Sequence, residues 1–227
     1  DNGVAIYTQG TGTTVNLNSG SALTIGNNQA VGVYAVGSNQ QINTNTGSGM
    51  TIGNNSFGIV NVGSGNTVTS NTANSVSLRR DAVYIYQNDN TGTVNSSTPL
   101  ISTGDRNYGL YGNGTMNNAG VIDFSTGNGN IGMYATTGGI GTNFGTIKVG
   151  ASNTAAKEFG VGMATGYYNE TTDTVSNQGT VINRGTIEVS KPNTMGMYAV
   201  GAGSKAINYG HINLSGNETV GMYIDRG

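Results

Sequence analysis

The feature that most constrains this chain is an imperfect repeat of about 27 residues. Copies of one short apolar segment recur as VGVYAVG at 31–37, IGMYATTG at 131–138, MGMYAVGAG at 195–203 and VGMYIDRG at 220–227. Nine equivalent positions, which we call the anchors, follow one another at steps of 27, 26, 26, 25, 23, 30, 34 and 25 residues. A repeat of this length predicts stacked units that bury a shared core. The anchors are Tyr7, Tyr34, Val60, Tyr86, Tyr111, Tyr134, Ala164, Tyr198 and Tyr223.

The residues around each anchor alternate in a way that predicts a β-strand. The residue before the anchor is apolar in every unit, the residue three before it is apolar or aromatic, and glycine lies between them in seven of nine units. With a period of two, the two apolar positions should face the core, and the glycine and tyrosine positions should face outward.

Two further apolar segments occur within the repeat. In the first four units a weaker apolar position follows the anchor, at Val15, Ile42, Val68 and Val94. The chain is therefore predicted to be all-β, a right-handed parallel β-helix of about nine rungs of roughly 27 residues, with three short strands per rung. The other segment is an aliphatic pair before the anchor: Leu23 and Ile25, Met50 and Ile52, Val76 and Leu78, Ile122 and Phe124, Ile147 and Val149, Ile187 and Val189, Ile212 and Leu214.

An Asn-x-Gly motif precedes the aliphatic pair in the later units, beginning at Asn118, Asn143, Asn183 and Asn208. Glycine and asparagine tolerate a positive φ better than other residues, so the motif predicts corners between sheets. Stacked corners would also let the asparagine amides form a hydrogen-bonded ladder from one rung to the next.

The composition limits the classes of partner. Charged residues make up 9% of the chain and the net charge is −2, so no basic surface for nucleic acid is expected. The chain has no cysteine, which excludes disulfides and thiol chemistry. No apolar run approaches the roughly 20 residues of a membrane helix, so direct membrane insertion of this segment is not expected. No cofactor is predicted.

The repeat resembles a known family. Pairs such as NFGTIKV with IGMYA, and NYGHINL with VGMYI, resemble the passenger region of large type V autotransporter adhesins, particularly those of fusobacteria. The resemblance implies export across the outer membrane, display on the bacterial cell surface, and adhesion to a host-cell glycan or protein receptor, or to a partner bacterium. Because both ends of the sequence fall within repeats, residues 1–227 are expected to form a single β-helix segment of a longer passenger domain.

Catalysis is tested by the positions of the acidic side chains. Parallel β-helices include polysaccharide-processing enzymes, which need clustered carboxylates or basic groups on one strand face. None of the seven aspartates shares a strand position with another on an adjacent rung, and His211 is the sole histidine. No catalytic or metal site is therefore predicted. A polysaccharide-processing β-helix enzyme and a purely structural stalk for a distal binding site remain the alternatives.

The outward tyrosines form the first candidate site. Stacked along one sheet, they are expected to form a structural ladder, or else a sugar-binding face centred on Tyr111 and Tyr134, because aromatic rings pack against the C–H faces of pyranose rings.

A second candidate site surrounds Ala164, which interrupts this file of tyrosines. Inserted loops at residues 150–159 and 166–176 flank its strand. They are either decorative insertions or the walls of a pocket that would include Tyr167, Tyr168, Glu170 and Asp173.

The third candidate site is the charged sequence RRD at 79–81, which falls close to the rung position of Asp105 and Arg106. The simplest interpretation is a set of salt bridges between turns. The alternative is a site for an anionic ligand formed by Arg79, Arg80 and Arg106.

Overall fold

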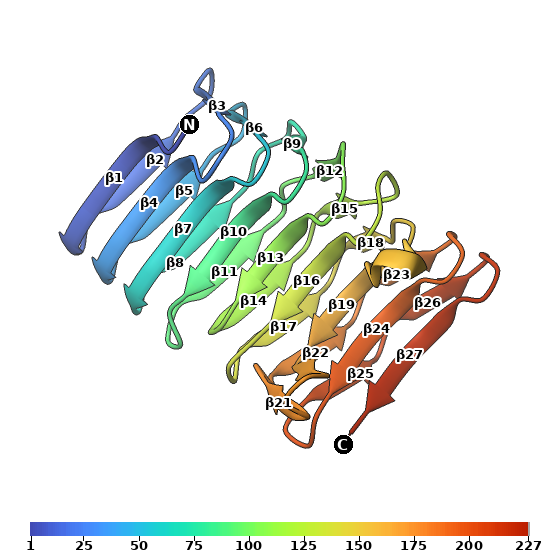
Figure 1. Ribbon diagram of the computed structural model, residues 1–227. Helices are drawn as coiled ribbons and strands as arrows, with labels where there is room; N and C mark the ends of the chain where they lie inside the picture. The colour runs from blue at the N-terminus through green and yellow to red at the C-terminus, as the bar shows by residue number, and fades with distance from the viewer. Residues whose placement is uncertain (227) are drawn as a thin grey trace.

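The computed structural model describes residues 1–226. The chain winds through about nine turns of roughly 26 residues, and three parallel sheets run along the resulting solenoid. Figure 1 shows the turns side by side from the N-terminus to the C-terminus. The strands of the front sheet run downward and the chain returns behind them before it advances, so the coil is right-handed. The predicted fold class is confirmed.

The anchors lie on a nine-stranded sheet, which we call the anchor sheet. Each anchor pairs with the next one, from Tyr7 with Tyr34 to Tyr198 with Tyr223, so the predicted spacing is correct at every step. The strands, in spatial order, are β1 (Val4–Thr11), β4 (Val31–Ser38), β7 (Phe57–Ser64), β10 (Val83–Asn88), β13 (Tyr108–Gly112), β16 (Ile131–Ala135), β19 (Val161–Thr165), β24 (Met195–Val200) and β27 (Val220–Asp225).

The second sheet follows the anchor sheet in each turn and has eight strands. The sequence marks its apolar position only in the first four units, but the strand continues in the later turns around Met116, Gly141, Val181 and Ala206. The strands are β2 (Thr14–Leu17), β5 (Gln41–Thr44), β8 (Thr67–Ser70), β11 (Thr93–Ser96), β14 (Thr115–Asn118), β17 (Ile140–Asn143), β22 (Thr180–Asn183) and β25 (Lys205–Asn208).

The third sheet, also eight-stranded, carries the aliphatic pairs. Leu23 pairs with Met50 and Ile25 with Ile52, as the sequence predicts, and the later pairs align in the same way. The strands are β3 (Ala22–Ile25), β6 (Gly49–Ile52), β9 (Val76–Leu78), β12 (Leu100–Ser102), β15 (Val121–Asp123), β18 (Thr146–Lys148), β23 (Thr186–Val189) and β26 (His211–Leu214).

One part of the predicted strand geometry is wrong. From Val33 to Met197 the residue before the anchor does lie in the core. The residue three before the anchor instead lies on the outer face, where the Tyr108 ring contacts the Tyr111 ring of the same strand at 5.2 Å. The pairing of β4 with β7 joins Val31 to Phe57 and Val33 to Ile59 but omits the glycine between them. This break in the two-residue alternation, like that at a β-bulge, turns the preceding side chain outward.

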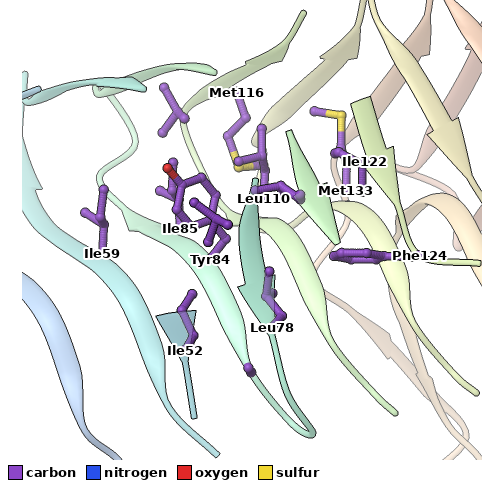
Figure 2. Close-up of a cluster of buried hydrophobic side chains, with 14 of the residues drawn as sticks. Ile52, Ile59, Leu78, Tyr84, Ile85, Leu110, Met116, Ile122, Phe124 and Met133 are labelled. Carbon is purple, nitrogen blue, oxygen red and sulfur yellow. The ribbon is translucent and has the colours of Figure 1, made fainter. Parts of the chain in front are cut away.

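The glycine position therefore faces the core and the adjacent turn. A Cβ on Gly132 would lie 2.7 Å from the carbonyl oxygen of Gly162 and 2.8 Å from Ile147 Cγ2, so a side chain here would disturb the stacking. In β10 this position holds Tyr84, which is fully buried among aliphatic side chains (Figure 2). Its hydroxyl lies 2.5 Å from Ser70 Oγ, within a buried group of hydroxyls.

The predicted asparagine ladder is present. Asn118 Nδ2 donates to Asn143 Oδ1 at 2.8 Å, Asn143 Nδ2 to Asn183 Oδ1 at 2.9 Å, and Asn183 Nδ2 to Asn208 Oδ1 at 2.8 Å. The predicted positive φ is wrong, because none of these asparagines adopts it. The glycine two residues later is needed for space instead, since a Cβ on Gly145 would lie 2.0 Å from the Gly120 carbonyl oxygen.

The two insertions have structure of their own. The first contains a short 3-10 helix, η1 (Thr154–Ala156), which ends at Lys157. The second is a hairpin of β20 (Tyr167–Asn169) and β21 (Thr174–Ser176), paired antiparallel outside the three main sheets. They precede and follow β19, so both border the turn in which alanine replaces the anchor tyrosine.

Candidate functional site

The tyrosine anchors form an ordered file on the outer face of the anchor sheet. Tyr111 stacks between its neighbours, with ring centroids 5.3 Å from Tyr86 and 5.4 Å from Tyr134 and interplanar angles of 21° and 19°. At the C-terminal end Tyr198 stacks on Tyr223 at 5.8 Å. The stacking that the sequence predicts is therefore present, interrupted by Val60 and Ala164.

The aromatic surface is wider than the sequence predicts. The Tyr108 ring lies 5.2 Å from that of Tyr111 and 6.2 Å from that of Tyr134. Phe57 lies 6.3 Å from Tyr86 and supplies a ring where the anchor is Val60. These residues were missed because strict alternation places them in the core, although the aromatic residue three before the anchor is visible in the sequence.

Burial keeps the central tyrosines protonated. It raises the pKa of Tyr111 and Tyr134, and the neighbouring tyrosines raise it further. The Tyr134 hydroxyl donates to the Gly166 carbonyl oxygen at 2.8 Å, so the file is fixed to the start of the second insertion. The rings thus offer neutral, rigid faces on the outer surface.

The gap in the file is covered. Ala164 is 2% exposed, although it pairs with Tyr134 on one side and Tyr198 on the other. Tyr167, two residues beyond β19, is 53% exposed. The exposed aromatic side chain next to the end of β19 is therefore Tyr167 of the second insertion.

Ion pairs hold the insertions in place. Lys157 Nζ of the first insertion lies 2.6 Å from Glu170 Oε2 of the second, and this hydrogen bond lowers the pKa of Glu170. Within the hairpin, the Tyr168 hydroxyl donates to Asp173 Oδ1 at 2.9 Å. The predicted wall residues Tyr168, Glu170 and Asp173 thus have specific partners in the structure.

Arg226 fixes the hairpin to the last turn. Its guanidinium lies 3.8 Å from the centre of the Tyr168 ring, a cation–π contact, and Nη1 lies 3.5 Å from Asp173 Oδ1. The sequence does not point to Lys157 or Arg226 as site residues. Their contacts with Glu170 and Tyr168 depend on how the inserted segments fold back on the solenoid.

The arginine cluster is a set of salt bridges between turns, as the simpler interpretation predicts. Arg106 binds Asp81 with two contacts, Nε to Oδ1 at 2.6 Å and Nη2 to Oδ2 at 2.8 Å, and binds Glu158 Oε1 through Nη1 at 2.6 Å. The hydrogen bond from Arg106 lowers the pKa of Asp81. Arg79 and Arg80 are exposed, with Arg80 Nε 3.4 Å from Asp81. Anion binding at these arginines stays a prediction.

Other carboxylates also have structural partners. Asp89, 2% exposed, accepts hydrogen bonds from the backbone N–H of Asn66 at 2.8 Å and of Thr91 at 2.9 Å. Asp123 pairs with Lys148 at 3.0 Å, and its pKa is lowered overall: burial raises it, but hydrogen bonds from Ser125 and Lys148 outweigh that effect. Within residues 1–226 no three histidine, cysteine or acidic side chains are grouped so as to hold a metal ion.

Comparison with known proteins bears on the C-terminal part of the chain. Residues 124–227 match the family model of the BigA third pectate lyase-like domain. The matched region includes both insertions and the last turns of the solenoid. The words pectate lyase-like describe a relationship of fold, and together with the solenoid the match fits a β-helix domain of a bacterial surface protein. No curated protein and no solved structure matches the chain. None of the described residues forms a helix that is long and apolar enough to cross a membrane.

Proposed function

We propose that this chain is a non-enzymatic adhesin segment that binds a host-cell glycan or protein receptor, or a partner bacterium. The binding surface is the outer face of the anchor sheet together with the two inserted segments. The observation that carries this proposal is the Lys157–Glu170 ion pair, which joins two insertions that flank one strand. A rod that only spaces a distal domain needs no ordered insertions, whereas inserted loops on a rigid scaffold commonly carry binding residues.

The chemistry of the surface suits a carbohydrate or a polar protein epitope. Tyr111 and Tyr134 present stacked, neutral rings, against which the C–H faces of a pyranose can pack. Tyr167 adds an exposed ring beside them. Because the rings and the hairpin are held by hydrogen bonds and ion pairs before a ligand arrives, little conformational entropy is lost on binding.

The comparisons and the repeat support the location proposed for the chain. The likeness of residues 124–227 to the BigA third pectate lyase-like domain supports a place on the bacterial surface. The resemblance of the repeats to autotransporter passengers, particularly fusobacterial ones, supports export across the outer membrane. A single continuous solenoid supports display as one rigid segment of a longer passenger domain.

The proposal that the chain is not an enzyme rests on how its carboxylates are used. A general acid needs a raised pKa, but the pKa values of Asp81, Asp123 and Glu170 are lowered by cationic or hydroxyl partners. These side chains are held in ion pairs within or between turns. They are suited to holding the solenoid together rather than to transferring protons.

Attachment to cells tests the proposal. Beads coated with the folded chain should attach to host epithelial cells or to a partner bacterium, and deletion of residues 167–174 should abolish attachment while the far-ultraviolet circular dichroism spectrum is retained. Replacing Tyr209, which is exposed on another face, with serine is the matched control and should leave attachment unchanged. Full attachment by the deletion variant would exclude the hairpin, and no attachment by the folded chain would favour a stalk.

A further inference from the structure

A second surface, away from the anchor sheet, carries its own groove. It has a volume of about 460 Å³ and lies where the second sheet turns toward the third. We infer that this groove binds a neutral, extended glycan chain of β-1,4-linked pyranoses, aligned with the solenoid axis. The inference rests on the proposed adhesive function, but it assigns the glycan to a surface that the tyrosine file does not include.

The groove follows the stack of turns. Thr69, Asn95 and Asn117 occupy equivalent positions on β8, β11 and β14, because Asn95 pairs with both of the others. Two residues further along each turn are Asn71, Ser97 and Ala119. The groove therefore has two parallel rows of small polar or short side chains, which run along the axis.

An aromatic ring closes one end of the groove. Phe144 occupies the same corner as Ala119, since the backbone N–H groups of Ala119 and Phe144 donate to Ser96 and Asn118 of the preceding turns. Phe144 is 53% exposed, and the small Ala119 leaves space beside its ring. An exposed ring at the end of a polar groove is a platform for the C–H face of a terminal pyranose.

The polar rows retain hydrogen-bonding capacity. Asn117 Nδ2 donates to Asn95 Oδ1 at 2.9 Å, and Ser97 Oγ donates to Asn71 Oδ1. Each primary amide has two donor hydrogens and two acceptor lone pairs. The bond between Asn117 and Asn95 therefore leaves donors and acceptors on both of these residues for a ligand. A sugar hydroxyl can both donate and accept a hydrogen bond, as a side-chain amide can. The amides of Asn95 and Asn117 are already held in position by the hydrogen bond between them.

Charge and spacing select the ligand class. The side chains that line the groove are asparagine, serine, threonine, alanine and phenylalanine, so nothing there neutralises an ionised ligand. Neighbouring strands are about 4.8 Å apart, close to the advance per sugar of a β-1,4-linked chain. Because neighbouring sugars of an extended β-1,4-linked chain face opposite ways, alternate sugars can meet equivalent side chains on alternate turns. The volume is within the range of about 300 to 1,000 Å³ usual for ligand sites.

Titration calorimetry of the folded chain with chitotetraose and cellotetraose tests the inference, with the helical α-linked maltotetraose as the contrasting glycan. At least one β-linked glycan should bind, and maltotetraose should bind at least tenfold more weakly. Phe144→Ala should weaken binding at least tenfold. The matched control Tyr209→Ala removes an exposed ring from the same corner of a later turn, 66% exposed and covered by Arg184 at 4.6 Å, and should change binding less than twofold.

A second pair of variants tests the polar rows. The double variant Asn95→Ala with Asn117→Ala should weaken binding. The control double variant, Asn16→Ala with Asn43→Ala, removes an equivalent 2.9 Å hydrogen bond between amides on the same sheet but outside the groove, and should leave binding unchanged. Absence of binding to both β-linked glycans, or unchanged binding by Phe144→Ala, would overturn the inference. If binding is lost in Tyr111→Ser with Tyr134→Ser but not in Phe144→Ala, the inference fails while the proposed adhesive function stands.

Discussion

Lys157 Nζ and Glu170 Oε2 lie 2.6 Å apart, although Lys157 belongs to the insertion before β19 and Glu170 to the insertion after it. Both side chains are about two-thirds exposed, at 68% and 67%. An exposed pair contributes little to overall stability. Its effect is local, because the pair favours one arrangement of the two insertions over the other conformations that loops of this length can adopt.

Reversing one charge of this pair should loosen the hairpin without unfolding the solenoid. Lys157→Glu places two carboxylates together, so chymotrypsin should cleave after Tyr167 or Tyr168 several times faster than in the wild-type chain. The thermal midpoint should stay unchanged, because the core is not involved.

The charge-swapped double variant is the control for this prediction. Lys157→Glu with Glu170→Lys restores opposite charges and should return the cleavage rate to near the wild-type value at low salt. Equal cleavage of all three proteins would show that the pair does not order the hairpin.

The asparagine ladder should contribute to stability in proportion to its burial. Asn143 both accepts from Asn118 and donates to Asn183 at a fully buried corner. Asn143→Ala leaves two buried amides without these partners, so we expect a loss of about 2 kcal/mol in urea unfolding. Asn208→Ala, at the exposed end of the ladder, should cost less than about 1 kcal/mol. Similar losses in both variants would contradict the role of burial.

Tyr84 should depend on its hydroxyl more than the outward tyrosines do. Its ring is fully buried and its hydroxyl lies 2.5 Å from Ser70 Oγ. Tyr84→Phe removes one hydrogen bond from Ser70 Oγ, which keeps Thr44 and Thr98 as partners, and should lower the free energy of unfolding by about 1 kcal/mol. Tyr111→Phe should change it by less than about 0.5 kcal/mol. An equal change in the two variants would show that the buried hydroxyl group is not stabilising.

Stability in acid should report the Asp81–Arg106 pair. Hydrogen bonding from Arg106 lowers the pKa of Asp81 in the folded chain below its ordinary value of 3.8. Below pH 3.8 the unfolded chain therefore binds more protons at this site than the folded chain does. The stabilisation is complete above that pH and is lost as the pH falls through the folded-state value.

Arg106→Gln removes this pH dependence. The difference in unfolding free energy between wild type and variant should be constant from neutral pH to about pH 5 and shrink toward about pH 2. Urea unfolding across that range measures it. A difference that stays constant down to the lowest pH would mean that the Asp81 pKa is not lowered by Arg106.

The fold was predictable because its repeat is long and its anchors recur. Each step from Tyr7 to Tyr223 matches the strand register, insertions included. The inner and outer faces were only partly predictable. The break in alternation at the glycine before each anchor depends on contact with the next turn, which no single unit of sequence contains. The buried Tyr84 is the residue that reveals this break, because a tyrosine replaces the inward glycine.

The candidate site was predictable in position but not in detail. The interruption at Ala164 and the longer steps around it locate the insertions. The sequence does not indicate that Lys157 meets Glu170 or that Arg226 covers Tyr168, because these contacts depend on loop conformation. The groove at Phe144 was missed for a different reason: its polar rows look like solvent-exposed strand residues until four successive turns are stacked.

Glycan-array binding of the folded chain tests the central claim most directly. We expect selective binding to one class of glycan at the tyrosine file and the hairpin, in addition to any glycan held in the Phe144 groove. That binding should be lost in Tyr111→Ser with Tyr134→Ser or in the variant that lacks residues 167–174. The claim would be contradicted if protein with a β-rich circular dichroism spectrum bound no glycan, no host cell and no partner bacterium. That result would make this segment a stalk.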